Sequence, residues 1–225
     1  SHLVHIYDAG LAKNLDDRLF VVMEYIEGVT LADEMQGRKI GSAQLLKWVR
    51  QICKALTGLH SQAPPVLHRD LKPDNILLGT DNHVRVVDFG LAAKMSLHGF
   101  VEGVAGTTAY MAPETLKGAS VPASDVYSIG LILYEGLAGH SPFKHLVAPY
   151  DLPSSLHLDW YYAKKRDLLI EPPSFHNNTV SRHLDRVVTR CLEFRPEKRY
   201  ASARDLLAAQ AAQRPVDVSR GPAGP

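Results

Sequence analysis

The feature that most constrains this chain is a polar segment at residues 68–75, which reads His-Arg-Asp-Leu-Lys-Pro-Asp-Asn. A long helical pattern precedes it, in which Ser42 can cap a helix whose apolar residues recur every three and four positions up to Leu59. Two short strand-like runs follow it, Asn75–Leu78 and Val84–Val87, with a turn between them. The pattern predicts a charged loop held between a helix and a pair of strands.

The rest of the chain is predicted to be mainly helical, with one more pair of strands near the N-terminus. Leu3–Tyr7 and Leu19–Tyr25 are β-branched and aromatic runs separated by polar residues, which is the pattern of a hairpin. The predicted fold class is therefore α+β with a mainly α-helical body. Further helices are expected in four places: over Val126–Leu137 with Ser124 as the cap, after Ser181, over Ala203–Gln213 with Ser202 as the cap, and around Leu158–Leu168.

Net charge, the length of the apolar runs and the two cysteines indicate which kinds of partner and which cellular compartment to expect. The formal net charge is +1, which gives no reason to expect nucleic acid or an acidic membrane as the main partner. The longest apolar stretch, Val126–Ala138, falls short of the roughly 20 residues that span a bilayer, so no membrane segment is expected. Cys53 and Cys191 lie far apart in helical patterns, which favours buried free thiols and a reducing, cytoplasmic compartment.

Segment 68–75 resembles the catalytic loop of the protein kinases, because six or more positions match in fixed order. Phosphoryl transfer needs a group that orients the attacking hydroxyl and cations that neutralise the phosphates. The resemblance implies that Asp70 orients the acceptor hydroxyl, that Lys72 lies against the transferred phosphate, and that Asn75 gives an amide oxygen to Mg²⁺. A lysine two residues after the aspartate is typical of serine/threonine rather than tyrosine kinases.

The tripeptide Asp88-Phe89-Gly90 follows the strand-like run Val84–Val87 and resembles the metal-binding motif of the same family. Taken alone, such a tripeptide after a strand is more often a turn in which glycine takes a positive φ. Its distance from the catalytic loop favours the interpretation as a metal-binding motif over that of a simple turn. The resemblance then implies that Asp88 supplies a carboxylate to Mg²⁺.

Residues 106–114, Gly-Thr-Thr-Ala-Tyr-Met-Ala-Pro-Glu, resemble the end of a kinase activation segment. The resemblance implies that Thr107 hydrogen-bonds the catalytic aspartate and lysine, and that Glu114 pairs with Arg199. It also implies that Asp125 braces the backbone of the catalytic loop. The alternative for Asp125 is an acidic residue that favours the first turn of a helix through the helix dipole.

Residues 21–26, Val-Val-Met-Glu-Tyr-Ile, resemble the strand and linker that line the adenine pocket of the family. This implies Met23 at the back of the pocket, the backbone of Glu24 and Ile26 as its hydrogen-bonding edge, and Leu77 as its floor. Each of these residues could instead serve plain strand or core packing. Three further residues match the regulatory hydrophobic spine of the family: Ile6, His68 and Phe89.

The resemblance covers only part of a kinase domain. No G-x-G-x-x-G is present, and no Val-Ala-x-Lys strand precedes the hairpin, so we expect an N-terminally truncated domain that binds Mg·ATP weakly and transfers phosphate poorly by itself. The expected organisation is a remnant of the N-lobe over residues 1–26, the C-lobe over 27–213, and a Pro/Gly-rich linker over 214–225.

The function implied is transfer of the γ-phosphate of ATP to Ser or Thr hydroxyls of proteins, by a eukaryotic-type (Hanks-type) kinase of the kind found in bacteria. ATP and Mg²⁺ are the implied cofactors. A pseudokinase or lobe-only scaffold is one alternative, although a pure scaffold would have no reason to keep Asp70, Lys72, Asn75 and Asp88 together. A small-molecule phosphotransferase is another, against which Lys72 and Arg199 argue. Glu135 and Asp74 match positions that often favour basic residues near the acceptor.

Overall fold

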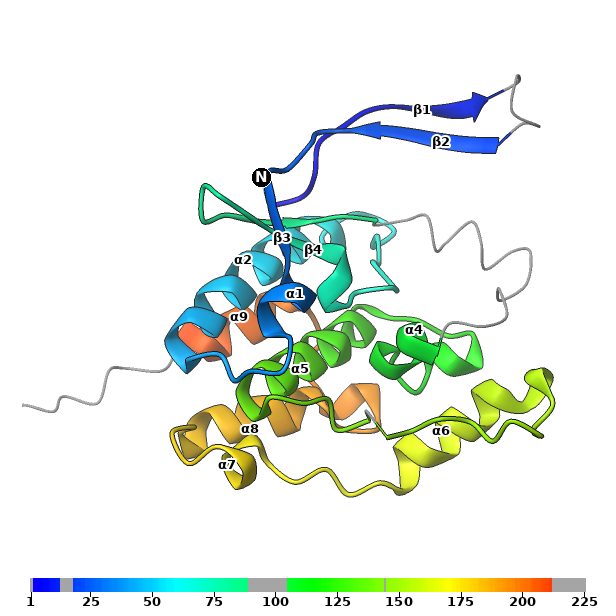
Figure 1. The fold of residues 1–225 in the computed structure, drawn as a ribbon, viewed down its shortest axis with the longest axis vertical. Coiled ribbons are helices and arrows are strands. Elements are labelled where there is room, and N and C mark those ends of the chain that lie inside the picture. The colour runs from blue at the N-terminus through cyan, green and yellow to red at the C-terminus, as the bar shows by residue number, and fades with distance from the viewer. Residues whose placement is uncertain (1, 13–17, 89–104, 144, 212–225) are drawn as a thin grey trace, which may run out of the picture.

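A computed structural model describes residues 2–12, 18–88, 105–143 and 145–211, which form a mainly helical body with two small sheets (Figure 1). The strands are β1 (Ile6–Ala12), β2 (Arg18–Met23), β3 (Gly28–Thr30), β4 (Ile76–Gly79) and β5 (Val84–Val86). The helices are α1 (Leu31–Met35), α2 (Ser42–His60), α4 (Ala105–Tyr110), α5 (Pro122–Ala138), α6 (His157–Asp167), α7 (Pro173–His176), α8 (Arg182–Cys191) and α9 (Ala203–Ala211). Short 3₁₀ turns are η1 (Pro73–Asn75), η2 (Thr115–Lys117), η3 (Ser154–Leu156) and η4 (Pro196–Lys198).

The two sheets are separate and both are antiparallel. Strands β1 and β2 pair from Ile6 opposite Met23 to Ala12 opposite Arg18, and this hairpin extends away from the helical body in Figure 1. The second sheet has the order β3-β4-β5 and carries the catalytic-loop segment at the start of β4. The N-terminal segment joins the two, because Val4 donates its N–H to the Val86 carbonyl at 3.1 Å.

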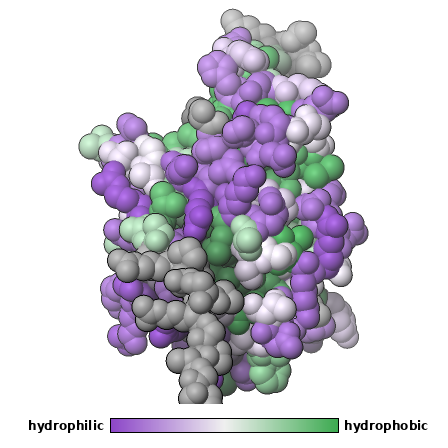
Figure 2. Space-filling model, turned by 90° about the vertical axis from the view of Figure 1, so that its left-hand side faces the viewer, coloured by the Kyte–Doolittle hydropathy of each residue, from purple (hydrophilic) through white to green (hydrophobic). Residues whose placement is uncertain are grey.

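Helix α5 is the centre of the core. Almost all of its residues are buried, which is expected of a helix that is apolar on every side. It packs against α2, α8 and α9, which carry their own apolar stripes onto it. At Gly130 the approach of α8 is close, since a Cβ there would lie 2.6 Å from Cβ of Cys191. Figure 2 shows mainly hydrophilic side chains over one outer face of the molecule, with hydrophobic ones in smaller groups.

Several predicted elements are confirmed with shifted ends. The N-terminal hairpin forms, but its first strand begins at Ile6 rather than Leu3, because His2 and Val4 pair with Val86 instead. The helix expected around Leu158–Leu168 is α6. Cys53 and Cys191 are buried free thiols as predicted. No helix within the described residues is both long and apolar enough to cross a membrane.

Two of the predicted helix caps are wrong and one is right. Gly41 stands at the N-cap of α2, and Ser42 is already its first residue. Helix α5 begins at Pro122, so Ser124 lies inside its first turn, where its hydroxyl accepts the N–H of Val121 at 3.0 Å. Proline at the first position of a helix has no N–H to leave unpaired, which explains the earlier start. Ser202 does cap α9, as predicted, because its hydroxyl accepts the N–H of Asp205 at 3.4 Å. Ser181, expected only to precede a helix, caps α8 by accepting the N–H of Leu184 at 3.2 Å.

Candidate active site

The buried carboxylate of Asp125, near the start of α5, holds the backbone of the two residues that precede Asp70. One oxygen accepts the backbone N–H of His68 at 2.9 Å and the other accepts that of Arg69 at 3.0 Å. His60, at the end of α2, lies 2.9 Å from the same carboxylate through its Nε2 atom. The backbone of Arg69 is left-handed, with φ of 68°, a conformation that non-glycine residues rarely adopt. The predicted bracing of the loop by Asp125 is therefore present in the structure.

His68 connects this loop to the strand that leads to Asp88. It is completely buried, and its Nε2 atom lies 3.0 Å from the carbonyl of Val87. Burial lowers the pKa of His68, while the nearby Asp125 carboxylate opposes that shift only in part. A neutral imidazole that donates from Nε2 leaves Nδ1 as an acceptor, and Nδ1 has no partner among the described residues. The histidine is thus a neutral, buried strut, meaning a side chain that links the loop before Asp70 to the Val87 backbone.

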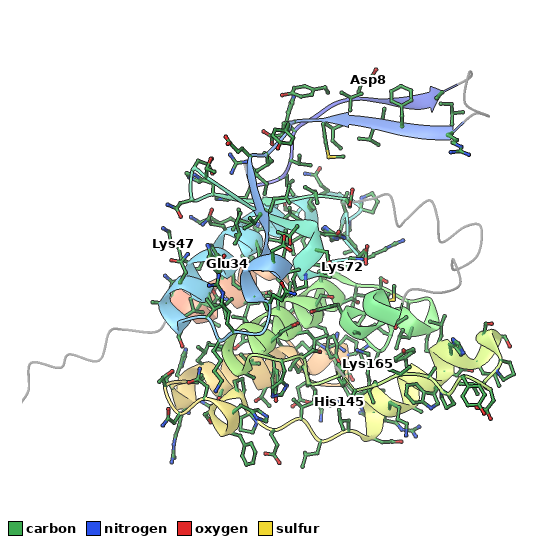
Figure 3. All side chains as sticks on the ribbon, in the orientation of Figure 1. Asp8, Glu34, Lys47, Lys72, His145 and Lys165 are labelled. Atoms are coloured by element: carbon green, nitrogen blue, oxygen red, sulfur yellow. The ribbon has the colours of Figure 1, made fainter. Side chains whose placement is uncertain are left out.

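Asp70, Lys72 and Asn75, to which the family resemblance assigns the chemistry of the loop, lie close together. The amide nitrogen of Asn75 donates to the Asp70 carboxylate at 3.1 Å and to the Asp70 carbonyl at 2.8 Å. The ammonium of Lys72 lies 3.6 Å from the same carboxylate oxygen, and in Figure 3 this lysine is found between the strands and the helical body. The aspartate is therefore fixed by an amide and accompanied by a cation. This is an arrangement that can orient a hydroxyl beside a phosphate.

The donor set suits a hard cation that is shared with phosphate oxygens. Because the nitrogen of the Asn75 amide is engaged with Asp70, its oxygen is the end that remains for a ligand. The Asn75 carbonyl accepts the N–H of Val87 at 3.0 Å, which places the next residue, Asp88, close to the asparagine. Mg²⁺ is commonly held by one or two protein oxygens together with phosphates and water. The Asn75 amide oxygen and the Asp88 carboxylate are donors of the kind that fits that pattern.

Glu114 and Arg199 form the predicted pair. Two guanidinium nitrogens donate to the two Glu114 oxygens at 2.7 and 2.9 Å, and the remaining donors are taken by backbone carbonyls. The guanidinium also lies 4.7 Å from the centre of the Tyr127 ring, in α5. A bidentate pair with every donor used is a strong anchor. It fixes the end of the segment that carries Thr107, although the Thr107 side chain lies outside what the structure describes.

One contact near the loop escaped prediction. Tyr110 donates its phenol to the carboxylate of Glu135, in α5, and its carbonyl accepts the Ser128 hydroxyl at 2.9 Å. Burial raises the pKa of Glu135, and the charge of Asp74 adds to that shift. Residues 109–110 therefore lie on the same side as the catalytic loop. The available signal was Glu135 itself, an acid within the apolar run of α5.

The residues predicted to line an adenine pocket are distributed over both sheets and the linker between them. Met23 ends β2 and is half-buried, and Leu77 is half-buried in β4. The N–H of Glu24 donates to the His5 carbonyl at 2.9 Å, so its carbonyl is the group left for a ligand, and Ile26 follows in the linker.

Two of the three residues that match the regulatory hydrophobic spine of the family are described by the structure, and they differ in burial. Ile6 is 41% exposed on the hairpin, so it is not packed in the core as a spine residue would be. His68 is buried, as expected of a spine residue. Phe89 and Gly90 lie outside the described residues.

Comparisons with known proteins give the family and several relatives of this chain. A protein-family match to the protein kinase domain covers residues 1–215. The serine/threonine-protein kinase PknB of Mycobacterium tuberculosis is 36% identical over 213 residues, which is 92% of this chain and 32% of the relative. A probable serine/threonine-protein kinase of Clostridium acetobutylicum is 33% identical over 211 residues, 92% of this chain and 30% of the relative. The chain thus spans about a third of the length of these curated relatives.

Proposed function

The chain belongs to the protein kinase family, and on this premise we propose that the protein transfers the γ-phosphate of ATP to Ser or Thr hydroxyls of other proteins. The observation that carries the proposal is the meeting of Asp70, Lys72 and Asn75 on one loop, with Asn75 holding the Asp70 carboxylate at 3.1 Å. The family generally uses ATP and Mg²⁺.

Each of the three residues has a distinct role in the proposed reaction. Asp70 accepts a hydrogen bond from the acceptor hydroxyl, aims its oxygen at the γ-phosphorus and takes up its proton. Lys72 places a positive charge against the transferred phosphate. Asn75 and Asp88 would hold Mg²⁺, which when bound neutralises charge on the phosphate oxygens. Thr107 would bond to Asp70 and Lys72, a role that rests on the resemblance of its segment.

The adenine is proposed to lie between the hinge and the second sheet. Met23 would close the back of the pocket and Leu77 its floor. The carbonyl of Glu24 and the backbone of Ile26 would supply hydrogen bonds, since the Glu24 N–H is already used by His5. These side chains need only shape and apolar surface to hold a flat ring.

A Ser or Thr acceptor is supported by Lys72, two residues after the aspartate, and by the bacterial relatives, which are named as serine/threonine-protein kinases. Asp74 is exposed, and its charge adds to the raised pKa of the partly buried Glu135 nearby. Two acids beside the acceptor position would favour a basic residue in the protein substrate.

The test is phosphate transfer from labelled ATP to a basic protein acceptor, using the protein in the length that its gene encodes. Asp70→Asn should lower kcat by about 10²–10⁴-fold, because the amide cannot accept the proton. The matched control is Asp81→Asn, in the exposed turn after β4, which should retain the wild-type rate. Equal rates for the two variants, or wild-type transfer only to small alcohols, would refute the proposal.

A further inference from the structure

Lys165 is a buried lysine in the last turn of α6. Its side chain is almost fully enclosed, with 4% of the residue surface exposed, and its ammonium donates to the carbonyl of Ala109 at 2.7 Å. The same nitrogen lies 3.9 Å from the centre of the Phe143 ring and 5.3 Å from that of Tyr127. Figure 3 shows Lys165 in the layer between α5 and α6. Residues 56 positions apart are thereby joined through one hydrogen bond.

The burial of the Lys165 side chain is not explained by packing alone. A buried ammonium is costly unless it is paired, and apolar residues of similar size usually give an equally stable or more stable protein. Within the described residues Lys165 forms no ion pair, and its compensation comes from one carbonyl and two aromatic faces. Burial lowers the pKa of Lys165 well below its usual range, yet the neutral amine can still donate to Ala109. What the lysine specifically provides is a fixed donor for that carbonyl.

The carbonyl of Ala109 belongs to the segment that faces the acceptor side of the catalytic loop. The next residue, Tyr110, is bonded to Glu135, and the charge of Asp74 acts on both groups. Four residues further along, Glu114 is held by Arg199. Segment 109–114 is therefore held by a basic side chain at each end, Lys165 at Ala109 and Arg199 at Glu114.

Both basic side chains lie over one aromatic ring. The Tyr127 ring in α5 has the Arg199 guanidinium at 4.7 Å and the Lys165 ammonium at 5.3 Å. Because α5 also supplies Asp125, which holds the catalytic loop, the same helix sets the position of the loop and of segment 109–114. A shift of Lys165 would move the segment relative to Asp70 without disturbing the Asp125 anchor.

We propose that Lys165 is a positioning residue for the protein acceptor, which fixes the backbone at Ala109 and thereby aligns segment 109–114 beside the catalytic loop. The inference rests on the proposed kinase function. It predicts a defect in the use of the protein substrate that is separate from ATP use and from stability.

The experiment compares Lys165→Met with Lys164→Met in the protein in its gene-encoded length. Lys164 is the neighbouring lysine of α6, exposed and 5.5 Å from the Trp160 ring, so it controls for loss of charge in the helix. Lys165→Met should raise the KM for the protein acceptor about tenfold, because a buried, specific donor to the segment is lost. The KM for ATP should stay unchanged, and the melting temperature should not fall. Lys164→Met should match the wild type in all three measurements.

Amide hydrogen exchange is a second measurement of the position of segment 109–114, and it does not depend on enzyme activity. Amides of residues 108–112 should exchange faster in Lys165→Met than in Lys164→Met, while those of residues 68–75 stay protected. An unchanged acceptor KM in an active enzyme, or unchanged exchange at 108–112, overturns the inference. If the wild type transfers no phosphate, the proposed kinase function fails and the role of Lys165 toward a protein acceptor fails with it, whereas unchanged exchange at residues 108–112 in an active enzyme overturns the role of Lys165 alone. Should Lys165→Met not fold, Lys165→Leu is judged by the same criteria.

Discussion

The carboxylate of Asp125 accepts the backbone N–H of Arg69 at 3.0 Å, across 56 residues of sequence. Arg69 stands in a left-handed conformation that costs a non-glycine residue about 1–3 kcal/mol unless its surroundings enforce it. The second oxygen of the same carboxylate takes the N–H of His68 at 2.9 Å. A buried acid at the start of the central helix therefore holds the residue before Asp70 in a conformation that it would not adopt alone.

Replacement of Asp125 by asparagine should weaken that hold. An amide presents one oxygen and one NH₂ group where two backbone donors and His60 now meet a carboxylate, so at least one donor loses its acceptor. We expect Asp125→Asn to lower the free energy of unfolding by about 1–3 kcal/mol. Urea denaturation of the chain measures this, with exposed Asp151→Asn as the control. Equal midpoints for the two variants would show that Asp125 is not the anchor.

Contacts within a motif could be predicted from the sequence, and contacts between motifs only through the family resemblance. Asp70 and Asn75, which meet in the structure, belong to one matched motif five residues apart, and the helical stripe of α2 follows from periodicity. The pairing of Glu114 with Arg199 was available only because both belong to known motifs. The boundaries at residues 26 and 213 stay predictions.

Contacts without a motif could not be predicted. Lys165 looks like one of three consecutive basic residues at the end of a surface helix, and spacing alone does not say which of them turns inward. His60 meets Asp125 only once α2 and α5 have packed. The two wrong caps have a similar cause, since several residues near each helix start could serve, and the structure has Gly41 and Val121 at the two N-cap positions.

The close approach of α5 and α8 should make Gly130 intolerant of a methyl group. A Cβ at this position would lie 2.6 Å from Cβ of Cys191 and 3.0 Å from the Leu192 side chain, and the Cys191 atom is attached to rigid backbone. Gly130→Ala should therefore destabilise the chain by about 1–3 kcal/mol through overpacking.

The matched control for Gly130→Ala is Gly58→Ala, in α2, where an added Cβ meets nothing within 4 Å. There the loss of backbone freedom in the unfolded chain should stabilise the protein by about 0.5–1 kcal/mol. Thermal unfolding of both variants gives the comparison. The packing argument fails if both substitutions shift the melting temperature in the same direction.

His68 should make the stability of the chain depend on pH in a defined direction. Because burial lowers its pKa in the folded state, the unfolded chain binds a proton on this histidine at pH values where the folded chain does not. The unfolding free energy should therefore fall as the pH drops below the ordinary value of 6.5, by at most about 1.4 kcal/mol per pH unit.

His68→Gln removes the titration while its amide nitrogen can still donate to the Val87 carbonyl, which the imidazole reaches at 3.0 Å. The stability advantage of the wild type over this variant should be constant from pH 8 to pH 7 and should shrink from pH 6.5 to pH 5, measured by urea denaturation at each pH. A constant difference over the whole range would mean that His68 takes up its proton equally in the folded and unfolded states, and the neutral, buried strut would then be the wrong description of this residue.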